Sequence, residues 1–193
     1  MDSILINNLY LVWFNPDEFP FFYEENKSRW REFLVALFAS FSLSVAGVYM
    51  TPPFHSETGL IIISAFLIHT VFLNMIPALL TGLIDFEIRK NGGEGDVNRM
   101  ISFIRYSLSI FTLSTPISII LVQMGIEGLF GFLIIMLLTL LLTIFNISRG
   151  AVAIYNIDLN RMFRLVFSSY ISSITLPIFL VLYYLSTFLG IVL

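Results

Sequence analysis

Cysteine is absent from this chain of 193 residues, and histidine occurs only twice. The absence of cysteine excludes disulfides, thiolate metal sites, cysteine nucleophiles and iron–sulfur clusters. The two histidines, His55 and His69, fall in a turn and in an apolar segment, so they cannot supply the clustered ligands of a catalytic zinc site. No nucleophile stands beside a base. We therefore expect no enzyme activity, no metal and no cofactor.

Charge is scarce as well. Charged residues make up 12% of the chain and the net charge is -3, which is too small to favour a nucleic-acid partner. Hydrophobic residues make up 58%, and the mean hydropathy is +0.91, far above the range of soluble domains. The composition predicts an integral membrane protein whose helices contact lipid.

Apolar runs indicate where the membrane is crossed. A helix needs roughly 20 mostly apolar residues to cross about 30 Å of hydrocarbon. Five stretches meet this requirement, at about residues 33–51, 59–84, 101–122, 128–147 and 166–189. The polar turn at 51–58 contains Pro52 and Pro53, and glycines and polar residues separate the later stretches. The predicted fold class is an all-α membrane protein with five transmembrane helices.

The basic residues predict the orientation, because Lys and Arg in short loops stay on the cytoplasmic side. The first and third loops and the C-terminus contain none. All ten lie before the first stretch or around the second and fourth loops: Lys27, Arg29, Arg31, Arg89, Lys90, Arg99, Arg105, Arg149, Arg161 and Arg164. This pattern places the N-terminus inside and the C-terminus outside. We expect a multi-pass membrane protein.

Residues 1–32 precede the five-helix domain of residues 33–193. They are too few to bury a core of their own. Residues 4–14 are apolar but too short to span, and their aromatic residues suit the headgroup layer. We interpret residues 1–32 as a cytoplasmic or interfacial segment, with a frayed terminus as the alternative.

A pentapeptide occurs twice. Asp96, Asn98 and Arg99 belong to the first copy, residues 96–100, and the second copy, residues 158–162, is identical at four of five positions, including Asp158, Asn160 and Arg161. Each copy begins a predicted span from the cytoplasmic side, and a proline follows within the span, Pro116 and Pro177. We infer a duplication in which helices 2–3 match helices 4–5 as parallel repeats. The aspartates suit helix N-termini, so capping stands beside a ligand or partner role for the arginines.

Polar residues inside a span usually face other helices. His69 and Asn74 lie within the second stretch, with Pro77 three residues after Asn74. The asparagine could satisfy a carbonyl freed by the proline. Two interpretations stay open for His69 and Asn74: interhelical hydrogen bonding, or a binding or proton site at the membrane midplane.

The chain resembles the Yip (Ypt-interacting protein) family in a compact prokaryotic form. The resemblance rests on residues 14–19 before the first span, the glycine-rich loop 92–95, the helix start running to Tyr106 and Pro116, and the loop ending at residues 158–161. It implies a five-helix bundle with a cytoplasmic N-terminus. Eukaryotic relatives act in vesicle trafficking and membrane shaping and associate with Rab-type GTPases. Their long N-terminal region is reduced here to about 32 residues, so the GTPase partnership is not carried over.

Two functions remain at this point. The first is a non-enzymatic membrane scaffold or adaptor of the Yip type, which binds a protein partner through the loops near Asp85–Asp96 and 148–158. The second is a small transporter, channel or lipid-binding component that uses the repeat interface around His69 and Asn74. Self-association is left open.

Overall fold

The computed structural model describes residues 3–23, 29–51 and 58–192, and residues 176–192 by their backbone alone. The described chain is helical. The elements are α1 (Ser3–Phe14), α2 (Phe19–Phe22), α3 (Trp30–Tyr49), α4 (Thr58–Lys90), α5 (Val97–Ser107), the 3-10 helix η1 (Leu108–Leu113), α6 (Ser114–Gln123), α7 (Gly128–Tyr155) and α8 (Leu159–Val192).

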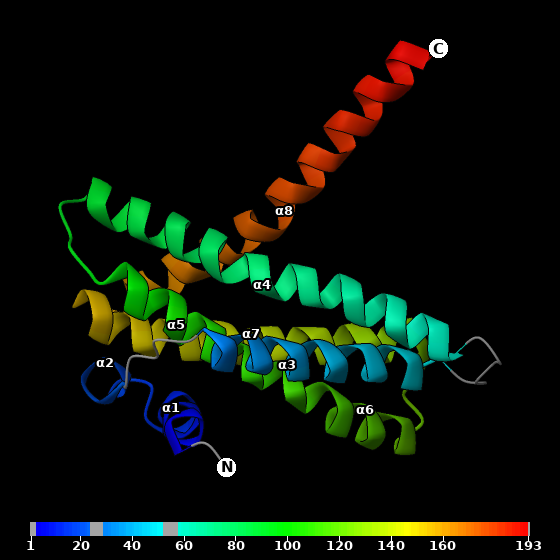
Figure 1. Cartoon of the computed structure of the whole chain (residues 1–193), viewed down its shortest axis with the longest axis horizontal. Helices are drawn as coiled ribbons and strands as arrows, with labels where there is room; N and C mark the ends of the chain where they lie inside the picture. Colours follow the sequence, from blue (N-terminus) through cyan, green and yellow to red (C-terminus); the bar gives the residue numbers. More distant parts are fainter. Residues whose placement is uncertain (1–2, 24–28, 52–57, 193) are drawn as a thin grey trace.

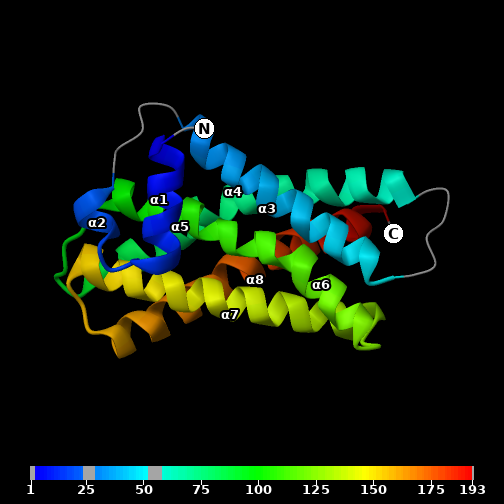
Figure 2. The same ribbon diagram turned by 90° about the horizontal axis from the view of Figure 1, so that it is seen from below.

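Four helical stretches are long and apolar enough to cross a membrane: Trp30–Tyr49, Thr58–Lys90, Val97–Gln123 and Gly128–Tyr155. They run side by side in two views (Figures 1 and 2). They coincide with the first four predicted spans, which confirms an all-helical membrane protein. The predicted fifth span lies within α8, and most of it, including Pro177, falls outside the residues whose side chains are described. His55 and both prolines of the predicted external turn also lie outside the described residues.

Two of these helices extend beyond the predicted spans toward the polar loops. α4 continues past residue 84, where Arg89 Nε and Asp85 Oδ2 form an ion pair of 2.6 Å one turn apart. α7 continues to Tyr155 and ends at Asn156, whose φ of 52° is the left-handed conformation that terminates helices. The ion pair in α4 and the C-terminal cap of α7 thus lie at helix ends that the apolar runs alone do not reveal.

The third span is a composite of α5, η1 and α6. Pro116 has no backbone N–H, so the carbonyl of Thr112, four residues earlier, loses its helical partner. The hydroxyl of Ser42 on α3 donates to that carbonyl at 2.9 Å. Thr115 returns two hydrogen bonds to Ser42, from its N–H at 3.1 Å and from its hydroxyl at 3.0 Å. The irregular turn is therefore stabilised by the neighbouring helix.

Small residues let the helices approach closely, as is common in membranes. Gly150 on α7 lies against Phe103 on α5, and a Cβ at Gly150 would overlap the phenyl ring. A Cβ added at Gly47 on α3 would lie 3.4 Å from the ring of Phe132 on α7, which is ordinary van der Waals contact. By contrast, Gly125 and Gly128 have positive φ angles and open space around them, so they shape the turn before α7.

The N-terminal elements are packed on one end of the bundle. Figure 2 shows α1 running across α3, α5 and α7 rather than along them, and Figure 1 shows it end-on. Leu11, Val12 and Phe19 are buried in a cluster with Phe103 and Tyr106 of α5.

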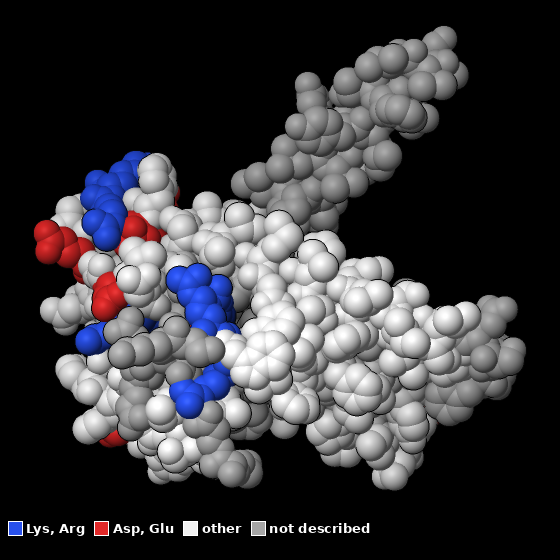
Figure 3. Space-filling model, viewed as in Figure 1, with Lys and Arg blue, Asp and Glu red and all other residues white. Residues whose placement is uncertain are grey.

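Most charged side chains of the described residues gather at one end of the bundle (Figure 3). We call this the charged end; α4 and α7 finish there, and α5 and α8 begin there. Figure 3 shows the Lys, Arg, Asp and Glu side chains of this face gathered at that end, whereas the rest of the described face is uncharged.

Candidate functional site

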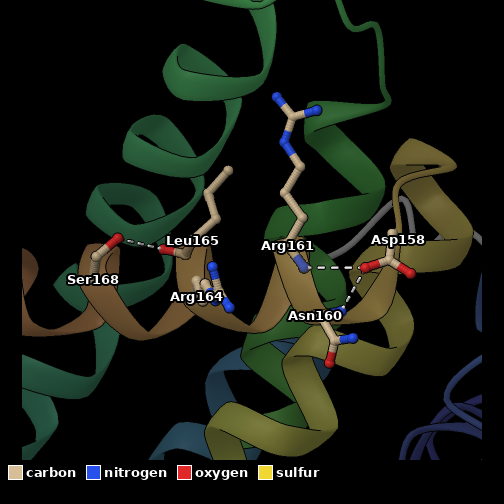
Figure 4. Close-up of a pocket in the computed structure, with 6 residues that line it drawn as sticks. All are labelled: Asp158, Asn160, Arg161, Arg164, Leu165 and Ser168. Atoms are coloured by element: carbon tan, nitrogen blue, oxygen red, sulfur yellow. Dashed lines mark hydrogen bonds between the residues drawn. The ribbon is translucent and has the colours of Figure 1, made fainter.

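Both copies of the repeated pentapeptide lie at the charged end, each at the start of a helix. Asp96 Oδ1 accepts a hydrogen bond from the N–H of Arg99 at 3.1 Å before α5. Asp158 Oδ2 accepts from the N–H groups of Asn160 at 3.0 Å and Arg161 at 3.4 Å before α8 (Figure 4). The two aspartates thus share the geometry of an N-cap, which satisfies backbone donors that a helix start leaves unpaired.

The arginines of the two copies differ in their surroundings. Arg99 donates from Nη1 to the carbonyl of Pro20 at 2.9 Å, and its Nε lies 3.3 Å from Asp96 Oδ2. Arg161 and the nearby Arg164 are exposed and form no ion pair with any described residue. In Figure 4 their side chains extend in different directions from α8. The N-terminal segment therefore contacts the arginine of the first copy, whereas the arginine of the second copy has no such contact among the described residues.

Each copy lines its own cavity. The first cavity, of about 270 Å³, is lined by Tyr23, Asp96, Asn98, Arg99 and Ser102. The second, of about 550 Å³, is lined by Asp158, Asn160, Arg161, Arg164, Leu165 and Ser168 (Figure 4). All six predicted motif residues thus line cavities, but the two sets line separate ones.

A buried polar network joins α3 to α5 beside the first cavity. Glu32 is almost fully buried and accepts from Arg105 Nη1 at 2.5 Å and from the Ser102 hydroxyl at 2.7 Å. Tyr23 donates its hydroxyl proton to Ser102 Oγ at 3.1 Å. A buried carboxylate is tolerated when its charge and lone pairs are satisfied in this way. Sequence reasoning missed this network; the signal for it was an acidic residue placed at the edge of a predicted span.

The N-terminal segment is bound to the long helices by further polar contacts. Trp13 donates from Nε1 to Ser109 Oγ at 2.6 Å. Asn146 of α7 donates from Nδ2 to the carbonyl of Val12 at 2.5 Å. Arg149 of α7 forms an ion pair with Asp17. These contacts come from residues far apart in the chain, so α1 and α2 are attached to the bundle rather than frayed.

The two loops predicted to bind a partner lie together. Tyr155, the last residue of α7, donates its hydroxyl proton to Asp85 Oδ1 of α4 at 3.5 Å. Its ring also packs directly against Gly95, where no Cβ would fit. The two predicted loop regions, 85–96 and 148–158, are therefore in contact with each other, and Glu87 and Glu94 are exposed in the first of them.

The structure separates the two predicted intramembrane residues. His69 Nδ1 lies 2.9 Å from Ser44 Oγ of α3, which is an interhelical contact. Asn74 donates from Nδ2 to the carbonyl of Thr70, one turn earlier on its own helix, at 2.8 Å. Pro77 frees the carbonyl of Leu73, so Asn74 does not satisfy that group as the spacing suggested.

His69 also lines a cavity of about 400 Å³ between α3, α4, η1, α7 and α8. Asn74 is not among its lining residues. The wall is apolar apart from His69 and Tyr170, which suits hydrocarbon better than a polar solute or an ion.

Elsewhere in the described part of the chain, no group of three or more His, Asp or Glu side chains is placed to hold a metal ion.

Comparison with known proteins supports the resemblance seen in the residues. The model of the Yip1 domain family matches residues 10–185, which is most of the chain. No curated protein and no solved structure matches.

Proposed function

The chain belongs to the Yip1 domain family, and from this premise we propose that it is a non-enzymatic membrane scaffold or adaptor that binds a protein partner at its charged end. The observation that carries this proposal is the joined surface of the two loops around Tyr155, Asp85 and Gly95. Exposed charges on a rigid, connected surface provide specificity for a partner. We also propose that it acts in membrane organisation or in trafficking-like processes.

The proposed topology has five spans, with the N-terminus and charged end in the cytoplasm and the C-terminus outside. α1 and α2, within residues 1–32, lie in the headgroup layer, and residues 33–193 form the transmembrane domain of a prokaryotic cytoplasmic membrane. Support comes from the gathering of the described basic residues at one end (Figure 3) and from the direction of α1 across the long helices (Figure 2). The matching caps at Asp96 and Asp158 support the parallel repeat.

Topology can be tested directly because the chain has no cysteine. Single cysteines replacing Asn91 and Met124 lie in turns at opposite ends, and both residues are exposed. In intact cells, an impermeant maleimide should label the Met124→Cys variant and reach the Asn91→Cys variant only after the membrane is opened. The reverse pattern would show that the charged end faces outward.

Partner binding is tested by neutralising the proposed surface. Glu87→Gln combined with Glu94→Gln should reduce capture of proteins that co-purify with the wild-type chain. Glu127→Gln is the matched control, because Glu127 is exposed at the opposite end. Equal capture by all variants, including variants lacking both loops, would contradict the scaffold proposal.

A second candidate function, lipid binding within the membrane, is favoured by the apolar cavity beside His69. It is one form of the second function expected from the sequence, a small transporter, channel or lipid-binding component. Native mass spectrometry of the protein purified in mild detergent should detect retained lipid. Solute flux in liposomes that His69→Ala abolishes would favour transport instead.

A further inference from the structure

The cavity beside His69 has features of a ligand site. Its volume of about 400 Å³ falls within the range of roughly 300–1,000 Å³ typical of small-molecule sites. Residues from five elements form its wall, and all but two of these side chains are aliphatic, methionine or phenylalanine. Among them are Leu133, Leu137 and Leu140, which follow one face of α7.

Tyr170 is the first of the two exceptions. Its side chain is 2% exposed, and it lines the cavity from α8. Among the described residues, Tyr170 takes part in one side-chain hydrogen bond, which its backbone carbonyl accepts from the Ser173 hydroxyl, and none involves its own hydroxyl. A buried phenol normally finds a partner, because an unpaired hydroxyl in an apolar environment is destabilising. A ligand bound in the cavity could supply that partner.

His69 is the second exception, and its hydrogen bonding indicates which ring nitrogen is available. Ser44 Oγ lies 2.8 Å from the carbonyl of Ser40 and 2.9 Å from His69 Nδ1. A hydroxyl has one proton, and a carbonyl can only accept, so we assign that proton to the bond with Ser40. His69 Nδ1 then carries the hydrogen, and Nε2 of the neutral ring is an acceptor.

The position of the cavity restricts the ligand. His69 lies near the middle of the predicted span 59–84, far from the headgroup layer. A phosphate or other charged group would be costly to bury there. A hydrocarbon chain would fit the apolar wall, and a neutral head group that both donates and accepts would match an acceptor at His69 and an unpaired hydroxyl at Tyr170.

We propose that this cavity binds a single-chain lipid with a neutral hydroxyl head group, of the long-chain alcohol class, which enters laterally from the bilayer. The chain lies along the α7 leucines, and the head group hydrogen-bonds with Tyr170 and His69. This inference rests on the second candidate function and names its ligand class. It is independent of partner binding at the charged end.

The test uses the full chain reconstituted in phosphatidylcholine vesicles and a hexadecanol analogue with a diazirine on its chain. Photolabelling of the wild-type protein should map to α7 and decrease with unlabelled hexadecanol. Hexadecane, which has the same chain without a head group, should compete less. Leu140→Phe puts a larger side chain in the cavity wall and should reduce labelling about tenfold, because it takes room from the hydrocarbon chain.

Tyr170→Phe keeps the ring and removes only the hydroxyl, so apparent affinity should fall about fivefold, the effect of one neutral hydrogen bond. The control is Leu138→Phe, since Leu138 is exposed on α7 but does not line the cavity; its labelling should match the wild type.

Several results would overturn the inference. Equal competition by hexadecane and hexadecanol would show that the head group contributes nothing to binding. Labelling that does not saturate, or that Leu140→Phe leaves unchanged, would mean that only surrounding lipid is labelled. Crosslinks between two copies through the cavity wall would identify a second copy as the occupant. Retained lipid that hexadecanol does not displace would leave lipid binding standing and reject this ligand class.

Discussion

Arg105 of α5 donates from Nη1 to Oε2 of Glu32 on α3 at 2.5 Å, and the side chains of the two residues are 21% and 4% exposed. This ion pair connects α3 and α5 at the charged end, beside the cavity lined by the first repeat motif. With Ser102 and Tyr23 it forms a chain of hydrogen bonds that reaches the N-terminal segment.

Glu32→Ala should lower the free energy of unfolding by about 3 kcal/mol, because it leaves Arg105 without its counter-charge in a largely buried site. Replacing both residues by Leu should recover much of the loss, since no unpaired charge remains. Reversible unfolding in mixed micelles measures both effects. Glu87→Ala, at an exposed position, should stay within about 0.5 kcal/mol of the wild type. A Glu32→Ala protein as stable as the wild type would show that the pair contributes nothing.

Gly150→Ala should destabilise the protein by about 1–3 kcal/mol, because the added Cβ overlaps the ring of Phe103 and the core is closely packed. Gly82→Ala is the matched control on another long helix, where nothing lies within 4 Å of the added atom. That control should be neutral or stabilising by up to about 1 kcal/mol, the helix propensity difference. Thermal unfolding in detergent compares them, and Phe103→Leu should partly rescue the Gly150→Ala variant. Similar melting temperatures for both glycine variants would argue against close α5–α7 packing.

Ser42→Ala should cost about 1–2 kcal/mol, because the carbonyl of Thr112 loses the donor that Pro116 cannot provide. Adding Pro116→Ala restores a backbone N–H to that carbonyl, so the double variant should lose less than the sum of the single variants. Ser64→Ala is the control, since Ser64 is exposed and bonds only to the carbonyl of Leu60 on its own helix. Strict additivity in the double-mutant cycle would be the contrary result.

Asn146→Ala should loosen α1, because the Asn146 amide is the donor to the carbonyl of Val12. Loss of about 1 kcal/mol corresponds to roughly fivefold faster opening. Hydrogen–deuterium exchange over Ser3–Phe14 in reconstituted protein should therefore accelerate by about that factor. Asn91→Ala, which removes only an exposed contact with the carbonyl of Glu87, should leave exchange in α1 unchanged. Exchange in α1 that is the same in both variants would mean that other contacts hold the segment.

The sequence by itself was sufficient for the membrane class, the family and the approximate position of four spans, because long apolar runs have few alternatives in water or lipid. The sequence also predicted the role of short polar motifs. Asp96 and Asp158 precede apolar helices, and both cap the helix that follows. Capping is a local interaction within a few residues, so local sequence predicts it.

Only the tertiary structure decided which side chains meet. Ser44 beside His69, Ser42 beside Thr112 and Glu32 beside Arg105 are pairs from different helices. Helix rotation and close approach select these partners, and periodicity in one helix carries no information about its neighbour's orientation. The same reason separates His69 from Asn74. His69 contacts Ser44 of α3, Asn74 bonds to Thr70 on its own helix, and of the two only His69 lines the cavity.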